Sequence, residues 1–341
     1  MGKVLIIAEA GVNHNGDFEK AKDLVKEAAD AGADFVKFQT FKAEKLVSKS
    51  AQKALYQQIN DKDEDNSQFA MLKKLEMPED WYLKLIEYSK SLGIKFLSTG
   101  FDEDSVDFLE SFGPEFYKIP SGEITNKPLI QHIARKGKPI ILSSGMANIE
   151  EIKKAVEVME HEGLDRSSIT VLHCNTEYPT PMEDVNLIAM LQIKKEIGVN
   201  IGYSDHTLGI EVPIAAVALG AIVIEKHFTL DKNLPGPDHR ASLEPYELKN
   251  MVNAIRNIEL AISGSGIKEP SKSEKPNIIV ARKSIHLKRN LKAGELLKMK
   301  DLIMKRPGDG ISPMDYESII GKTLNLDLEE DSKLTWQVLG V

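Results

Sequence analysis

Short runs of apolar and β-branched residues recur along the first 230 residues of the chain. Each run has the length of a single strand and is nearly continuous in apolar character, which is typical of strands buried on both faces. We therefore expect eight strands, over residues 4–10, 34–40, 94–100, 116–121, 139–145, 169–174, 200–205 and 221–228.

The segments between these runs have helical spacing. Residues 150–163 place Ile152, Ala155, Val156 and Met159 on one face, and residues 18–32 end on a glycine suited to a helix C-terminus. Eight alternating strand–helix units over about 260 residues predict a (β/α)₈ TIM barrel, an α/β fold. A doubly wound open sheet is the alternative, but GVNHNGD after the first strand lacks the glycine pattern of that fold.

Two further segments stand apart from the barrel. Residues 41–77 form a long connection after the second strand, which is typical of a lid or binding element. A disordered insertion is the alternative, against which Tyr56 and Phe69 count. After the barrel (1–262), residues 263–280 have the Gly, Ser, Pro and Lys content of a linker, and 281–341 predict a small β-rich domain.

Composition excludes several classes of protein. Lys and Arg number 44 against 52 Asp and Glu, a net charge of −8, which argues against a nucleic-acid binder. The single cysteine, Cys174, excludes a disulfide framework and a cysteine zinc site. The short N-terminal apolar run resembles neither a membrane span nor a secretory signal, so we expect a cytoplasmic protein without membrane partners.

Polar side chains stand at the carboxyl ends of all eight expected strands. In a TIM barrel these ends meet at the active-site mouth. His206 and His227 end sequential strands about 4.8 Å apart, so both imidazoles could bind one divalent cation. Two structural histidines in the barrel mouth are the alternative.

Lys37 and Lys118 lie inside apolar runs, where an unpaired charge is costly. With the hydroxyl groups at neighbouring strand ends they could hold a phosphate or carboxylate. An internal ion pair is the alternative explanation for a single buried lysine, but the presence of two lysines weighs against that explanation. Glu123, just past the fourth strand, could act as an acid or base or stabilise a positive charge, or it could be a helix N-terminal carboxylate.

The sequence resembles the sialic acid synthase family, the bacterial N-acetylneuraminate synthases and their legionaminate and pseudaminate relatives. The resemblance covers nearly the whole chain. It depends on AEAGVNHNG (8–16), VKFQTFKAEKLVS (36–48), KIPSGEITN (118–126), ILSSGMA (141–147), HCNTEYPTPMEDVNL (173–187), SDHT (204–207), EKHFTLDK (225–232), GPDHRAS (236–242) and ARKSI (281–285).

The resemblance implies a barrel followed by an antifreeze-like (SAF) domain. It also implies condensation of phosphoenolpyruvate with an N-acylated mannosamine-type sugar and a divalent metal, Mn²⁺ before Mg²⁺ or Co²⁺. His206 and His227 would bind the metal, and Glu123 would lie beside the reacting carbons. The implied phosphoenolpyruvate contacts are Lys37, Thr99, Lys118, Ser121, Ser143, Asn175 and Ser204. The implied sugar contacts are Glu9, Gln39, Tyr178, Asp238 and Arg282.

In the family the small domain completes the partner subunit's site in a domain-swapped homodimer. Arg282 is the expected contributor, although Lys283 stands where some members have the arginine. The motifs favour N-acetylmannosamine as the sugar, with N,N'-diacetyllegionaminate synthesis from 2,4-diacetamido-2,4,6-trideoxymannose as the alternative. The remote alternatives are a Schiff-base aldolase using Lys118 or Lys37 and a non-enzymatic ice- or carbohydrate-binding protein.

Overall fold

The computed structural model describes residues 2–61 and 65–340, so residues 62–64 of the expected lid segment and both terminal residues lie outside it. The chain divides into two compact units, residues 1–264 and 265–341. Within the described residues no helix is both long and apolar enough to cross a bilayer.

The first unit is built on eight parallel strands in the order β3-β2-β1-β8-β7-β6-β5-β4. No hydrogen-bonded ladder joins β3 to β4 in the described part of the chain, yet the two strands lie against each other, so the sheet closes into a near-complete barrel. The predicted TIM-barrel fold is confirmed. The strands are β1 (Leu5–Gly11), β2 (Phe35–Thr40), β3 (Lys95–Gly100), β4 (Tyr117–Ile119), β5 (Ile140–Ser143), β6 (Ile169–His173), β7 (Asn200–Asp205) and β8 (Val223–His227).

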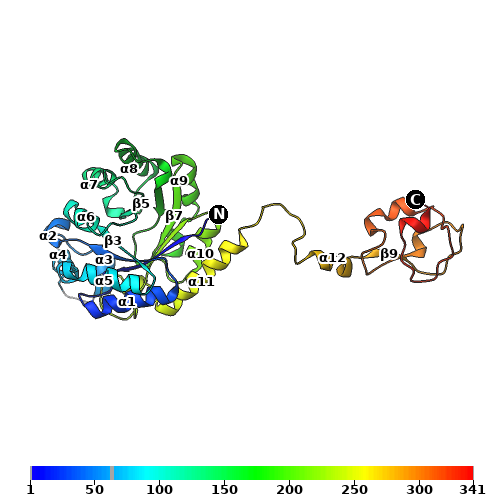
Figure 1. The fold of residues 1–341 in the computed structure, drawn as a ribbon, viewed down its shortest axis with the longest axis horizontal. Coiled ribbons are helices and arrows are strands. Elements are labelled where there is room, and N and C mark those ends of the chain that lie inside the picture. Colours follow the sequence, from blue (N-terminus) through cyan, green and yellow to red (C-terminus); the bar gives the residue numbers. More distant parts are fainter. Residues whose placement is uncertain (1, 62–64, 341) are drawn as a thin grey trace. The chain divides into compact units, whose positions relative to one another are not determined.

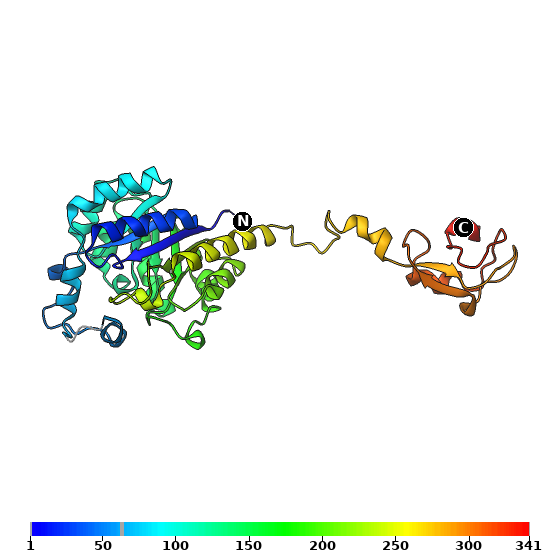
Figure 2. The same cartoon turned by 90° about the horizontal axis from the view of Figure 1, so that it is seen from below.

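Helices surround the strands (Figure 1), and α1 lies beside α11 along one side of the sheet (Figure 2). The expected face of α8 is buried through Ile152, Ala155, Val156 and Met159, and α1 ends at Gly32, whose φ of +83° a glycine adopts without strain. The helices of this unit are α1 (Phe18–Ala31), α2 (Ala43–Leu46), α3 (Leu55–Asp61), α4 (Gln68–Leu75), α5 (Glu79–Ser91), α6 (Glu103–Glu110), α7 (Lys127–Ala134), α8 (Ile149–His161), α9 (Ala189–Ile197), α10 (Glu211–Ala218) and α11 (Pro245–Ala261).

Apolar residues fill the barrel on both sides of its wall. Inward-facing residues such as Ile7, Phe35 and Leu172 close the amino-terminal end of the interior, while a larger layer packs between the strands and the helices. With the amino-terminal half of the interior filled, only the carboxyl ends of the strands are left to carry a polar site. The lid segment, residues 41–77, folds into α2, α3 and α4 over its described residues.

The second unit has its own small core, which includes Ile285, Leu291 and Leu334. Over its described residues the sheet has two antiparallel strands, β9 (Ser284–Leu287) and β10 (Leu302–Lys305). Isolated bridges and the short helix α13 (Tyr316–Ile319) supplement it. A small antiparallel β unit is therefore confirmed, with less strand than its composition suggested.

The expected linker, 263–280, contains a helix that the sequence did not predict, α12 (Lys275–Ala281). Ser271 and Glu274 exchange hydrogen bonds between side chain and backbone immediately before it, and Pro276 stands in its first turn. These are helix-start signals. The prediction of a linker took account of the composition of the segment alone.

Candidate active site

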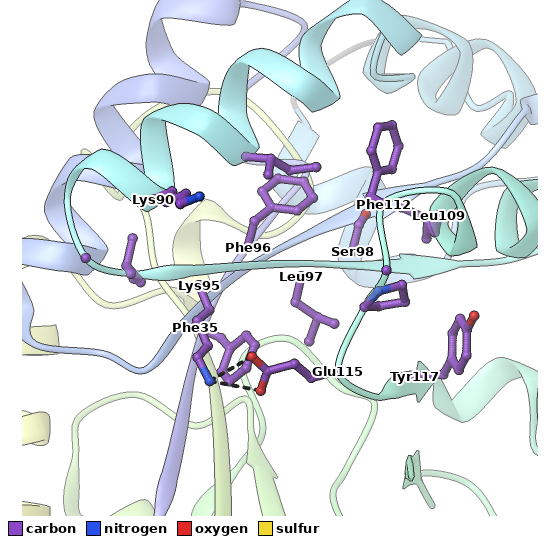
Figure 3. Close-up of a pocket in the computed structure, with 15 residues that line it drawn as sticks. Phe35, Lys90, Lys95, Phe96, Leu97, Ser98, Leu109, Phe112, Glu115 and Tyr117 are labelled. Atoms are coloured by element: carbon purple, nitrogen blue, oxygen red, sulfur yellow. Dashed lines mark hydrogen bonds and ion pairs between the residues drawn. The ribbon is translucent and has the colours of Figure 1, made fainter. Parts of the chain in front are cut away.

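The carboxyl ends of the eight strands surround a cavity of about 590 Å³. A second cavity, of about 380 Å³, lies at the amino-terminal half of β3 (Figure 3). Its wall is mainly apolar, and its charged groups, among them the ion pair of Lys95 with Glu115, are exposed. Of these two cavities in the described part of the chain, only the one at the strand ends brings together buried carboxylate, ammonium and imidazole groups, so it is the candidate active site.

Thirteen of the fifteen predicted site residues line this cavity. They come from all eight strand ends and the loops that follow. They are Glu9, Lys37, Gln39, Thr99, Lys118, Ser121, Glu123, Ser143, Tyr178, Ser204, His206, His227 and Asp238.

Two lysines and two glutamates form a buried cluster at the cavity floor, the lysine cluster: Lys37, Lys118, Glu9 and Glu225. The Lys37 ammonium lies 2.8 Å from Glu225 and 3.3 Å from Glu9. Lys118 lies 3.6 Å from Glu225 and donates a 2.7 Å hydrogen bond to Ser143 Oγ. Both lysines are therefore internally ion-paired, contrary to the sequence argument that two of them weighed against such pairing.

Charge within the lysine cluster is set by burial and by these neighbours. Burial lowers the pKa of Lys118 to about 8, and burial raises the pKa of Glu9 to about 7 against the attraction of Lys37. Burial would also lower the pKa of Lys37, but Glu225 and Glu9 outweigh it and leave that pKa raised. The cluster can thus carry net positive charge when Glu9 is protonated, as an anion site requires.

Hydroxyl groups extend the lysine cluster around the cavity. Thr99 Oγ1 is buried without a hydrogen-bond partner. Ser121 Oγ accepts a 3.0 Å hydrogen bond from the Gly145 N–H, and Ser204 donates to Glu225. A Cβ at Gly145 would come within 2.8 Å of Ser121 Oγ, so glycine is needed for this approach. The free hydroxyl of Thr99 is available to a ligand.

His206 and His227 lie side by side, with ring centroids 5.5 Å apart. Tyr178 packs over His206 at 4.1 Å and meets the edge of His227. His206 Nδ1 contacts the Asn175 carbonyl oxygen. Burial lowers the pKa of His206 to about 4 and that of His227 well below its usual value, so both imidazoles are neutral near pH 7 and able to bind a metal.

The donor set fits a divalent cation with open coordination positions. His227 Nδ1 is buried without a hydrogen-bond partner, as expected for a ring nitrogen that makes its contact with a bound ligand. Among the described residues no group of three or more His, Cys, Asp or Glu is arranged around a metal position. Water or substrate oxygens would therefore supply the remaining ligands.

The other side of the cavity is shaped by the lid segment and the loop after β8. Tyr56 of α3 stacks on Tyr178 with ring centroids 5.0 Å apart. The buried Asn60 amide donates to the carbonyl oxygens of Pro237 (2.8 Å) and Tyr178 (3.3 Å). These hydrogen bonds connect α3 to the loop after β8 and to the loop after β6. Burial raises the pKa of Asp238 to about 7.

Two predicted residues are not in the cavity wall. Asn175 uses its side chain to accept from the Glu177 N–H at 2.7 Å, and Thr176 lines the cavity in its place. Arg282 is exposed at the end of α12 in the second unit, and no ion pair holds it in the described part of the chain.

Glu225, a polar residue at the end of the eighth expected strand, was assigned no role from the sequence, and Tyr56 was not predicted as a site residue. Glu225 lies two residues before His227, so strand alternation alone would have placed both side chains inside the barrel. Glu123, by contrast, lies in the predicted wall, where its carboxylate accepts a 2.6 Å hydrogen bond from Asn126.

A comparison of the whole sequence with known families matches residues 24–268 to the NeuB family. The chain belongs to the NeuB family. Residues 282–339 match the SAF domain, which confirms the predicted identity of the second unit.

Several relatives of this NeuB family chain are named as sugar-acid synthases, so it is an enzyme of the same family. The N,N'-diacetyllegionaminic acid synthase of Campylobacter jejuni is 53% identical over 97% of this chain and 98% of its own length. The enzyme of the same name from Legionella pneumophila is 50% identical over 97% and 93%. A sialic acid synthetase structure from Leptospira borgpetersenii is 37% identical, with a TM-score of 0.71 over 81% of this chain and 90% of that one.

Proposed function

We propose that this NeuB family enzyme condenses phosphoenolpyruvate with 2,4-diacetamido-2,4,6-trideoxymannose, giving N,N'-diacetyllegionaminate and phosphate. The observation that carries the proposal is the juxtaposition, in one buried cavity, of the lysine cluster and the neutral His206–His227 pair. The first suits an anionic substrate, and the second suits a metal that polarises a carbonyl.

The choice of sugar reverses the preference drawn from the sequence motifs. Those motifs favoured N-acetylmannosamine. Two relatives that are at least half identical to this chain are named N,N'-diacetyllegionaminic acid synthases, which supports the alternative.

Each group has a role in the proposed reaction. Lys37, Lys118 and the surrounding hydroxyl groups would hold the phosphate and carboxylate of phosphoenolpyruvate. A divalent metal held by His206 and His227, Mn²⁺ by preference, would supply Lewis acidity toward the sugar aldehyde. Glu9, Gln39, Tyr178 and Asp238 would orient the open-chain sugar.

Bond formation joins C3 of phosphoenolpyruvate to C1 of the sugar and leaves positive charge at C2. The Glu123 carboxylate would stabilise that charge. Water then adds to C2, and the tetrahedral intermediate releases phosphate by C–O cleavage while the C2 carbonyl forms. Exclusion of bulk water by the lid segment would favour addition of one positioned water molecule.

We also propose a domain-swapped homodimer, in which Arg282 of one subunit contacts the N-acyl group of the sugar bound by the other. The exposure of Arg282 and its lack of an ion-pair partner in the described residues support this assignment.

Phosphate release from phosphoenolpyruvate tests the proposal. We expect release with the diacetamido sugar to exceed that with N-acetylmannosamine at least tenfold in kcat/KM. EDTA should abolish release and added Mn²⁺ should restore it. Preference for N-acetylmannosamine would contradict the choice of sugar, and unchanged activity in EDTA would contradict the metal.

A further inference from the structure

A fully buried ion pair lies on the outer face of the barrel wall behind the two histidines. The Lys226 ammonium contacts Asp205 Oδ2 at 2.5 Å and the Thr207 carbonyl oxygen at 2.6 Å. The Thr207 hydroxyl lies 2.9 and 3.0 Å from the two Asp205 oxygens, and its N–H donates to Oδ1. All three residues are 0% exposed.

Strand register places this pair directly below the histidines. In the β7–β8 ladder Ser204 pairs with Glu225 and Asp205 pairs with Lys226, and the ladder ends there. His206 and His227 are the next residues along. The Ser204–Glu225 hydrogen bond holds the penultimate pair from inside the barrel, while Asp205 and Lys226 hold the last pair from outside.

The two histidine rings differ in how they are fixed. His206 contacts the Asn175 carbonyl oxygen through Nδ1, but His227 Nδ1 has no hydrogen-bond partner. The position of the His227 ring therefore depends on its backbone and on packing against Tyr178. That backbone is held by a 2.9 Å hydrogen bond from the Leu243 N–H to the His227 carbonyl oxygen and by the pairing of His227 with Glu9 of β1. On the side facing β7 and His206, its nearest anchor is Lys226, one residue earlier.

A requirement for stability alone does not account for this arrangement. The desolvation free energy of two buried charges offsets much of their mutual attraction. Apolar residues of similar volume often stabilise a fold equally well. What the ion pair adds is a fixed distance and orientation between two strand ends. Residues that orient metal ligands in this way typically change metal affinity 10- to 100-fold when replaced.

We propose that Asp205 and Lys226, braced by Thr207, are a positioning pair that holds His206 and His227 at the separation needed to bind one divalent cation. This inference rests on the metal site of the proposed function. It assigns a role to two residues that touch neither substrate nor metal.

The test compares single and double variants of the full-length protein by calorimetric titration with Mn²⁺ alone and by thermal unfolding. Lys226→Met leaves the Asp205 charge unpaired, so the Tm should fall by roughly 10 °C and Mn²⁺ should bind on the order of 10- to 100-fold more weakly. The neutral double variant Asp205→Asn/Lys226→Met retains an acceptor for Thr207. It should regain most of the Tm but not the Mn²⁺ affinity.

A matched control is available at the opposite end of the barrel. Asp34, immediately before β2, pairs with Arg256 of α11 at 2.8 Å. Asp34→Asn/Arg256→Met removes an ion pair that also joins two elements of the barrel unit but is partly exposed and far from the histidines, and it should leave Mn²⁺ affinity within about twofold of wild type. If Lys226→Met does not fold, Thr207→Val removes only the hydroxyl contacts of Thr207 to Asp205 and should still weaken Mn²⁺ binding several-fold.

Two outcomes separate this inference from the proposed function. A wild-type protein that binds no Mn²⁺ overturns both. A wild-type protein that binds Mn²⁺, with a double variant that binds it equally well, overturns the positioning pair alone. Support also requires kcat to fall in the double variant while the KM for phosphoenolpyruvate stays within about threefold, because the lysine cluster stays in place.

Discussion

At the residue scale, Glu225 organises the candidate site although it was not among the predicted site residues. It contacts both lysines and accepts a hydrogen bond from Ser204. Burial pushes its pKa upward, but Lys118 and Lys37 outweigh burial and hold that pKa well below its usual value. A permanently ionised Glu225 keeps two ammonium groups together that would otherwise repel each other.

The pKa of Lys118 predicts how binding of phosphoenolpyruvate depends on pH. Burial lowers this pKa to about 8, so Lys118 is charged below pH 8 and neutral above it. Because the phosphate is fully ionised above about pH 7, affinity should fall up to tenfold per pH unit as the pH rises past 8. Calorimetric titration of phosphoenolpyruvate between pH 6.5 and 9.5 measures the fall.

Variants assign this pH step to the lysine. Glu9, with a pKa of about 7, changes affinity in the same direction. Lys118→Gln should therefore bind weakly at pH 7 and lack the step near pH 8, whereas the exposed Lys26→Gln should keep it. A wild-type affinity that stays constant from pH 7 to 9.5 would contradict the anion-binding role of Lys118.

Prediction of single residues succeeded where strand alternation and the position of a strand end determine which way a side chain points. It placed Lys37, Lys118 and both histidines correctly in one cavity. It could not foresee Asn175, because a local turn takes up that side chain. An asparagine side chain that hydrogen-bonds to its neighbouring backbone cannot point into a cavity, and the hydrophobic periodicity of the sequence does not reveal such local hydrogen bonds.

At the element scale, the lid segment is the part of the barrel unit whose conformation the sequence could not specify. Length and polarity identified it as a binding element, but its three short helices depend on contacts with distant loops. Asn60 is the main example, since it joins α3 to residues more than 100 positions away. Strand periodicity, in contrast, predicted both ends of all eight barrel strands to within two residues.

Asn60→Ala should loosen the lid segment without unfolding the barrel. It removes the two hydrogen bonds that Asn60 donates and the one that it accepts from Arg240, each worth about 1 kcal/mol, so the KM for the sugar should rise roughly 10- to 100-fold. The Tm and the affinity for phosphoenolpyruvate should change little. Steady-state kinetics and limited proteolysis measure both effects, with Ser50→Ala in the same segment as control. A KM unchanged from wild type would show that Asn60 does not hold the lid closed for the sugar.

Gly202 of β7 sets the packing of the barrel interior. A Cβ at this position would lie 2.5 Å from both the Val223 carbonyl oxygen and Leu172 Cδ2. Gly202→Ala should therefore reduce the free energy of unfolding by about 1–3 kcal/mol through overpacking. Urea denaturation measures this, and Gly264→Ala, where a Cβ meets nothing within 4 Å, is the control. Equal stability of both variants would be inconsistent with a rigid wall at β7.

At the scale of the whole molecule, the two units have separate cores, and nearly all of residues 263–283 between them is exposed. The barrel cavity contains the lysine cluster and the histidine pair, and none of the described residues in its wall is an arginine. Arg282, the proposed contact to the N-acyl group of the sugar, thus lies on a different unit from the residues proposed to carry out the reaction. Sequence composition could separate the units, but it could not say whether Arg282 serves its own chain or a second copy.

Heterodimers distinguish these arrangements. Lys118→Ala inactivates the barrel of one chain, and Arg282→Ala removes the acyl contact of the other, so each homodimer should be inactive or nearly so. In a swapped heterodimer, isolated with two different affinity tags, the intact barrel receives Arg282 from its partner. One of the two sites is then complete, and activity should reach about half that of the wild-type dimer. If Arg282 serves its own chain, neither site is complete and the heterodimer stays inactive. Failure to isolate any heterodimer after co-expression would instead count against the dimer itself.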